Sequence, residues 1–156
     1  MTLDTFKNLV QEIVAEAQKL SAAHTDSGNA PVNYSCIFSH SPAEYKEMTA
    51  LAEQLGSIVQ ETAMGPIFQI DPIATEAGSL ALLKVRKPEA RRHQLGYADF
   101  TVADYTTFKQ TYLGRAGFRL IKRSEYETVE LSDDVFTALA YYAYPPLPDV
   151  LKIVGA

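Results

Sequence analysis

The fold of this chain is indicated by two similar stretches of its sequence, Asn33-Tyr34-Ser35-Cys36-Ile37-Phe38-Ser39-His40-Ser41-Pro42 and Gly96-Tyr97-Ala98-Asp99-Phe100-Thr101-Val102-Ala103-Asp104-Tyr105. Each stretch opens with a small residue and a tyrosine, continues as a strand, and reaches a helix N-cap residue seven positions after the tyrosine. A helical pattern, a glycine and three strand-like runs follow both times. The repeat therefore predicts two β-α-β-β-β units, which together would build a cupped sheet around a cavity.

The first unit is expected over residues 32–87. Its helix has a strong start, because Ser41 to Glu44 combine a capping box with proline at the first helical position. The expected elements, in order, are a strand over 32–39, a helix over 42–55, a hairpin of 57–62 and 66–70, a loop over 71–78 and a strand over 79–87.

The second unit is expected over residues 95–144, where Asp104 caps the helix and Gly114 follows it. The expected elements are a strand over 96–102, a helix over 104–113, a hairpin of 118–123 and 126–131, and a strand over 135–144. In the tail, residues 145–156, Pro148 is expected to start a short helix that contains Val150, Leu151 and Val154.

An additional amphipathic helix is expected over residues 3–22, since apolar residues recur there at helical spacing with charges between them. The prediction is thus a single α+β domain, residues 1–156, with a mixed sheet and an extra N-terminal helix. A cystatin-like meander wrapped around helix 3–22 is the alternative. It does not account for the helix at 104–113.

Composition and charge narrow the class of partner. The net charge of −5 argues against nucleic-acid binding. No apolar run is long enough to span a membrane, and residues 1–20 lack the apolar centre of a signal peptide, so a cytoplasmic location is expected. Cys36 is the single cysteine, which excludes an intrachain disulfide and a thiolate metal cage.

Residues 32–145 resemble the vicinal-oxygen-chelate superfamily of glyoxalases, bleomycin-binding proteins and extradiol dioxygenases. The likeness lies in the tyrosine-to-cap spacing of both units and in the final strands, Leu83-Lys84-Val85-Arg86-Lys87-Pro88 and Ala140-Tyr141-Tyr142-Ala143-Tyr144-Pro145. Family members carry a histidine where each tyrosine stands and a glutamate in each final strand. The resemblance implies a glyoxalase-like fold with a site inside the cup.

The four positions that carry metal ligands in that family are occupied here by Tyr34, Lys84, Tyr97 and Tyr141. A lysine ammonium has no lone pair, and a neutral phenol is a poor ligand, so no metal and no cofactor is expected. A register shift that makes Asp99 a ligand is the alternative. The three histidines, His24, His40 and His93, are expected at the surface.

The expected ligand-binding residues are those on the faces that line the family's site. They are Tyr34, Cys36, Phe38, Lys84, Tyr97, Asp99 and Tyr141, with Tyr142 and Tyr144 in place of Tyr141 in the other strand register. Tyrosines combine apolar area with a hydroxyl, which suits an aromatic or amphipathic ligand, although tyrosines also simply pack sheets. Lys84 and Asp99 are expected to form an ion pair across the cavity, because a lone buried charge is costly.

The function expected from these residues is metal-independent binding of a small organic ligand in a tyrosine-lined cavity. A metal-dependent lyase, isomerase or dioxygenase is one alternative. A fold relic that serves protein–protein contact through helix 3–22 is another. A second copy of the chain is a candidate partner, whereas nucleic acid and membranes are not expected to bind.

Overall fold

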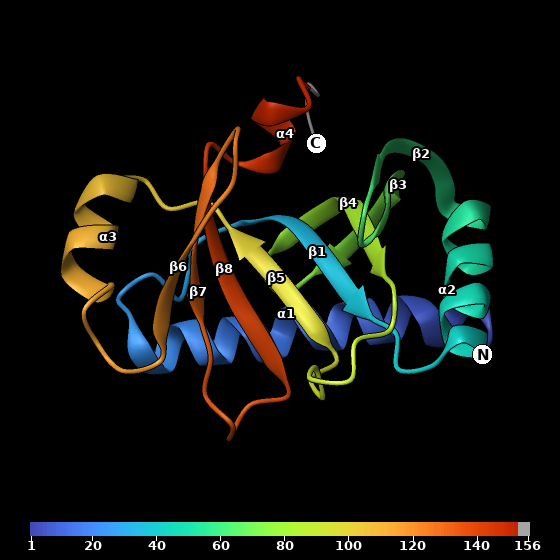
Figure 1. Ribbon diagram of the computed structural model, residues 1–156, viewed down its shortest axis with the longest axis horizontal. Helices are drawn as coiled ribbons and strands as arrows, with labels where there is room; N and C mark the ends of the chain where they lie inside the picture. Colours follow the sequence, from blue (N-terminus) through green and yellow to red (C-terminus); the bar gives the residue numbers. More distant parts are fainter. Residues whose placement is uncertain (153–156) are drawn as a thin grey trace.

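The structure is a computed structural model that describes residues 1–152. It contains four helices and eight strands within these residues (Figure 1). The helices are α1 (Leu3–His24), α2 (Pro42–Leu55), α3 (Tyr105–Tyr112) and α4 (Leu147–Val150). The strands are β1 (Val32–Phe38), β2 (Gly56–Thr62), β3 (Gly65–Thr75), β4 (Gly78–Arg86), β5 (Gly96–Phe100), β6 (Phe118–Lys122), β7 (Glu127–Leu131) and β8 (Ala138–Tyr144).

All eight strands join one mixed sheet in the order β2-β3-β4-β1-β5-β8-β7-β6. In the first half of the sheet β1 pairs in parallel with β4, and in the second half β5 pairs in parallel with β8. The halves meet where β1 and β5 run antiparallel. Since β1 and β2 follow each other in sequence but lie three places apart in the sheet, with β3 and β4 between them, the meander considered as the alternative is wrong.

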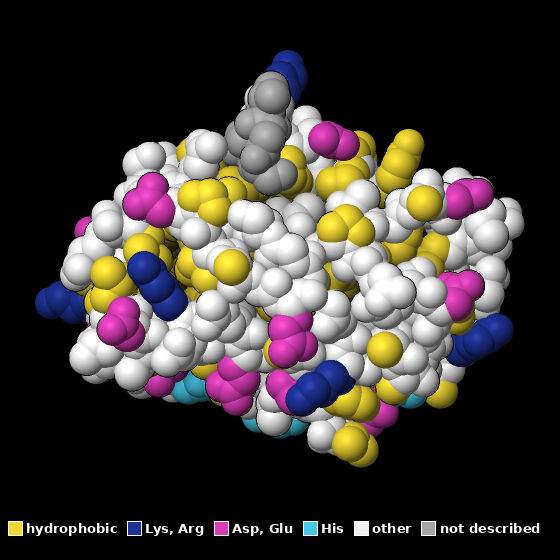
Figure 2. Space-filling view, turned by 180° about the vertical axis from the view of Figure 1, so that it is seen from behind, with side chains coloured by type: hydrophobic (Ala, Val, Ile, Leu, Met, Phe, Trp, Pro, Cys, Tyr) yellow, Lys and Arg dark blue, Asp and Glu magenta, His cyan; other side chains and the backbone are white. Residues whose placement is uncertain are grey.

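Three helices cover one face of the sheet. Helix α1 runs along the sheet behind its central strands, while α2 and α3 lie near its two ends (Figure 1). Buried residues of α1, such as Val10 and Ile13, share one apolar core with buried residues of α2 and α3. Viewed from behind, the surface shows acidic, basic and hydrophobic side chains interspersed (Figure 2).

Alternation along each central strand separates this core from the opposite face. In β1, Ile37 belongs to the core under the helices, whereas Tyr34, Cys36 and Phe38 belong to a second, smaller cluster. The sheet therefore has a helix-covered face and a face that is free to form a site.

Helix α1 begins where the sequence indicates and ends two residues later than expected, at His24. Thr2 caps it, with reciprocal hydrogen bonds between Thr2 and Thr5. At its other end the Thr25 N–H donates to the carbonyl of Ser21. The local capping signals account for the start, because they need no tertiary partner.

Three strand boundaries differ from the expected ones by two residues or more. Strand β3 continues to Thr75, through the stretch expected to be a loop, and a short turn leads into β4 at Gly78. Its far end pairs with β4 after a register irregularity between Gln69 and Ile73 that contains Pro72, which cannot donate to a ladder. Strand β5 ends at Phe100, opposite the first residue of β1, and β8 begins at Ala138, opposite the first residue of β5.

Near the C-terminus, α4 begins at Leu147, one residue before the expected start. Val154, which was expected in this helix, lies outside the described residues. Within residues 1–152 no helix combines the length and the apolar character needed to span a membrane.

Candidate functional site

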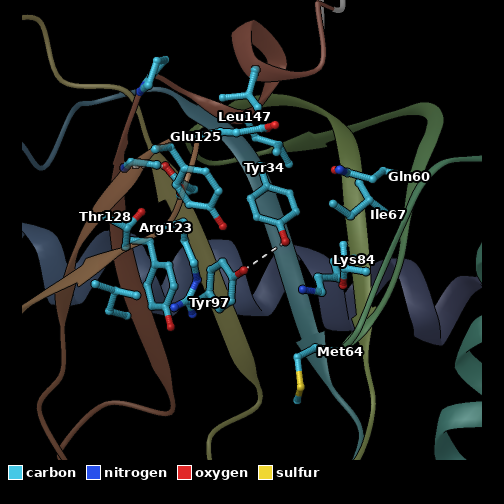
Figure 3. Close-up of a pocket in the computed structure, with 18 of the residues that line it drawn as sticks. Tyr34, Gln60, Met64, Ile67, Lys84, Tyr97, Arg123, Glu125, Thr128 and Leu147 are labelled. Carbon is cyan, nitrogen blue, oxygen red and sulfur yellow. Dashed lines mark hydrogen bonds between the residues drawn. The ribbon is translucent and has the colours of Figure 1, made fainter.

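A cavity of about 500 Å³ lies on the face of the sheet that the long helices leave uncovered. Its floor is formed by β4, β1, β5 and β8, and the hairpins β2–β3 and β6–β7 supply its walls. Leu147 and Val150 of α4 also line it. The close-up shows tyrosines at its centre, Lys84 and Ile67 on one side, and Arg123 and Thr128 on the other (Figure 3).

Strand register fixes the arrangement of the floor. Tyr34 of β1 lies opposite Asp99 of β5, which in turn lies opposite Tyr141 of β8. One step along the strands, Cys36 lies opposite both Lys84 and Tyr97. The two rows bring residues from four strands onto one face, although they are spread over more than a hundred positions of the sequence.

The hydroxyl groups of Tyr34 and Tyr97 lie 3.0 Å apart at the centre of the floor. Their rings meet edge to face, with centroids 5.7 Å apart. Burial raises the pKa of both phenols well above the ordinary value, with the nearby Cys36 thiol adding to the rise for Tyr34 and the Tyr34 phenol adding to it for Tyr97. Both side chains are therefore neutral hydrogen-bonding groups at physiological pH.

Tyr141 extends this aromatic floor. Its ring stacks on that of Tyr97, with centroids 3.8 Å apart and an angle of 7° between the planes. Its hydroxyl donates to Oε2 of Glu130 at 2.8 Å. Glu130 is buried, and the guanidinium groups of Arg119 and Arg92 lie 3.1 and 3.6 Å from its carboxylate. The stack is thus held in place by a buried, charge-compensated carboxylate.

Asp99 is a buried acid that lines the cavity. Its Oδ1 accepts hydrogen bonds from the Asn33 amide at 3.3 Å and the Ala143 N–H at 3.2 Å. Burial raises the pKa of Asp99 to about 7, although these two hydrogen bonds oppose the rise. Asp99 therefore changes charge near neutral pH, which an exposed aspartate does not do.

The expected ion pair between Lys84 and Asp99 is not formed: no ion pair between these two residues occurs in the described structure. Strand β1 separates β4 from β5, so the two backbones lie two strand spacings apart, roughly 10 Å. Asp99 is instead satisfied by Asn33 and Ala143. Burial lowers the pKa of Lys84, whose amine remains in the cavity.

Four other residues expected at the site, Cys36, Phe38, Tyr142 and Tyr144, do not line the cavity. Cys36 and Phe38 pack beside the cavity tyrosines without lining the cavity, and burial raises the pKa of the Cys36 thiol to about 11. Tyr142 points to the helix-covered face, where its hydroxyl donates to Ser21 at 2.6 Å. Tyr144 is 57% exposed and stacks on Tyr105. Tyr141, not Tyr142 or Tyr144, therefore faces the cavity.

The residues that form the walls of the cavity were not predicted from the sequence. Gln60 and Met64 come from the β2–β3 hairpin, and Arg123, Glu125 and Thr128 come from the β6–β7 hairpin and β7. Alternation along 127–131 could have placed Thr128 on the cavity face. Nothing local predicts that the two hairpin tips, some sixty residues apart, approach the same cavity.

The cavity residues do not fit the divalent metal that the resemblance would imply. The tyrosines at the ligand positions are neutral phenols, and the fourth position holds the Lys84 amine. Among residues 1–152 no group of three or more His, Cys, Asp and Glu side chains is arranged to hold a metal ion. His24 pairs with Asp133 and His40 with Glu44, both away from the cavity.

Comparison with known proteins identifies a solved structure with the same fold. No protein-family model matches the sequence, and no curated protein matches it. A solved structure described as "Structural Genomics, Protein EC4020" superposes with a TM-score of 0.72 at 11% sequence identity. The match covers 96% of this chain and 91% of that chain, so the two proteins share a fold over nearly their whole length.

Proposed function

We propose that this protein binds a small organic ligand without a metal, and that it is a divergent member of the vicinal-oxygen-chelate superfamily. The sheet order supports the relationship, because each half consists of one strand, one helix and three further strands in the same sequence and pairing. Its two first strands, β1 and β5, lie together at the centre. The cavity also lies on the strand face where the resemblance led us to expect a site, which supports the same proposal.

The observation that carries the proposal is the open cavity itself. A fold relic would be expected to fill this space with its own side chains, whereas here about 500 Å³ lies between the two hairpins. Ligand sites in proteins commonly have volumes of about 300–1,000 Å³ and combine apolar walls with a few polar groups. The Tyr34–Tyr97 hydroxyl pair and Lys84 supply such groups here.

A metal-dependent enzyme is less well supported by the same residues. Asp99, the candidate ligand in the alternative, has Oδ1 engaged by Asn33 and Ala143. The nearest partners on its face, Tyr34 and Tyr141, are phenols. These contacts suit a hydrogen-bonding pocket better than a coordination shell.

The proposal is tested by looking for ligand both in the purified protein and in a binding screen. Native mass spectrometry before and after denaturation would reveal an organic compound that co-purifies. A fragment screen by NMR would then be expected to shift the amide signals of Tyr34, Lys84 and Tyr97 together.

A matched pair of variants separates the cavity from the rest of the surface. Ile121→Trp places a large ring on a wall of the cavity, and Val135→Trp places the same ring on a loop where Val135 is 83% exposed. Ile121→Trp should abolish binding while Val135→Trp leaves it unchanged. Loss of binding in both variants, or in neither, would contradict the proposed site.

A further inference from the structure

The hydroxyl pair at the centre of the cavity has one proton more than its own hydrogen bond uses. Tyr34 and Tyr97 each carry one O–H group, and in their 3.0 Å contact only one of them donates. Within the described structure, neither hydroxyl makes a further hydrogen bond to an oxygen or nitrogen atom, and the Cys36 sulfur beside Tyr97 is only a weak acceptor. One O–H donor therefore remains available to an acceptor in the cavity.

The amine of Lys84 adds donors at the same place. Figure 3 shows this side chain reaching from β4 toward the hydroxyl pair. Within residues 1–152 its side-chain amine makes no ion pair and no hydrogen bond, and only the backbone of Lys84 pairs, with β1 and β3. A partly buried amine without a partner is unfavourable, and an oxygen anion beside it would favour its charged form.

Neither of the buried carboxylates near the floor, Asp99 and Glu130, accepts a hydrogen bond from these donors. Asp99 Oδ1 is bound by Asn33 and Ala143. Glu130 accepts a hydrogen bond from Tyr141 and pairs with Arg92 and Arg119. It is not among the residues that line the cavity. A ligand bound in the cavity would supply the acceptor that these donors lack in the described structure.

The surface next to these donors is aromatic and apolar. The stacked rings of Tyr97 and Tyr141 form part of the floor, and Ile67 and Leu147 add apolar walls. An aromatic ring can stack or meet these tyrosines edge to face, and such pairs contribute beyond the area that they bury. A ligand with a planar apolar body fits this part of the cavity.

We propose, on the basis of the function proposed above, that the ligand is a small aromatic carboxylate. Its carboxylate oxygens accept hydrogen bonds from the Lys84 amine and from the free O–H of the Tyr34–Tyr97 pair. Its ring lies against the Tyr97–Tyr141 floor and the apolar walls. No covalent step is involved.

The test compares two probes that differ only in their head group, naphthalene-2-carboxylate and its neutral analogue naphthalene-2-carboxamide, by isothermal titration calorimetry. Wild-type protein should bind the carboxylate at least about tenfold more tightly, since charge-assisted hydrogen bonds are stronger than neutral ones. Lys84→Met should weaken carboxylate binding by about 10- to 100-fold and change carboxamide binding little. The control, Lys46→Met, makes the same change at an exposed position of α2 and should bind as wild type.

The possible outcomes separate this inference from the proposed function. Equal binding of both probes by wild type, or unchanged carboxylate binding by Lys84→Met, would overturn the carboxylate assignment and leave a small-molecule binder. Co-purification of a ligand that is not a carboxylate would do the same. Failure of both probes, of the fragment screen and of the search for a co-purified ligand would overturn both. If Lys84→Met does not fold, the comparison of the two probes on wild-type protein still tests the carboxylate assignment.

Discussion

Tyr141 and Tyr142 are consecutive residues of β8, and their hydroxyl groups donate hydrogen bonds on opposite faces of the sheet. Tyr141 donates to Glu130 on the cavity face at 2.8 Å, and Tyr142 donates to Ser21 of α1 at 2.6 Å. One tyrosine therefore helps to shape the cavity, while the other ties the N-terminal helix to the sheet. This division leads to predictions that separate stability from binding.

The Tyr142–Ser21 contact should be measurable as a coupling energy. In a double-mutant cycle of Tyr142→Phe and Ser21→Ala, we expect a coupling of about 0.5–1.5 kcal/mol in the free energy of unfolding, because the bond is short and buried. Urea unfolding of the four proteins gives this value. Ligand binding should be unchanged, since Tyr142 faces away from the cavity. If the effects of the two substitutions on the free energy of unfolding are strictly additive, the bond does not anchor α1.

Asp99 should make stability depend on pH. Its pKa is about 7 in the folded protein and 3.8 in the unfolded chain, so the folded state binds more protons between these values. The free energy of unfolding therefore falls as pH rises through this window, and the loss is complete above about pH 7.

Asp99→Asn removes this titration and keeps an oxygen for Asn33 and Ala143. From pH 5 to pH 8 the stability of the variant relative to wild type should rise by about 2–3 kcal/mol. Urea unfolding of both proteins at each pH measures the difference and cancels the histidine titrations that they share. A constant difference across this range would mean that Asp99 titrates as an exposed acid.

Gly96 should not tolerate a side chain. A Cβ there would overlap the carbonyl oxygen of Cys36 and press on Ile13 of α1, at the junction of β1 and β5. Gly96→Ala should therefore cost about 1–3 kcal/mol of stability, as expected for overpacking. Gly114→Ala is the control, because a Cβ at that position meets no atom within 4 Å. Thermal unfolding should show a clear loss for the first variant and a change within about 1 kcal/mol for the second.

Purified protein should contain far less than one transition-metal ion per chain. The cavity offers neutral phenols and an amine, and the rise in the pKa of Tyr34 and Tyr97 opposes the phenolate forms that would bind a metal. Elemental analysis after purification in metal-free buffer measures the content. Near-stoichiometric zinc, iron, manganese or nickel that is lost in Asp99→Ala would support the enzyme alternative instead.

Local sequence determined where the helices and strands form and, for the central strands, which side chains share a face of the sheet. Ser41-Pro42 and Asp104 start α2 and α3 as predicted, because capping uses hydrogen bonds within one helical turn. Alternation along β1 and β5 placed Tyr34, Tyr97 and Asp99 on the face that carries the cavity, since successive side chains of a strand point to opposite faces.

Tertiary structure decided the features of the site that depend on which strands pair with each other. The separation of Lys84 from Asp99 follows from β1 lying between β4 and β5, and the partners of Asp99 come from β1 and β8. The extent of β3 and the choice of Tyr141 over Tyr142 depend on pairing register in the same way. Pairing between distant segments depends on the balance of many contacts, which no single stretch of sequence contains.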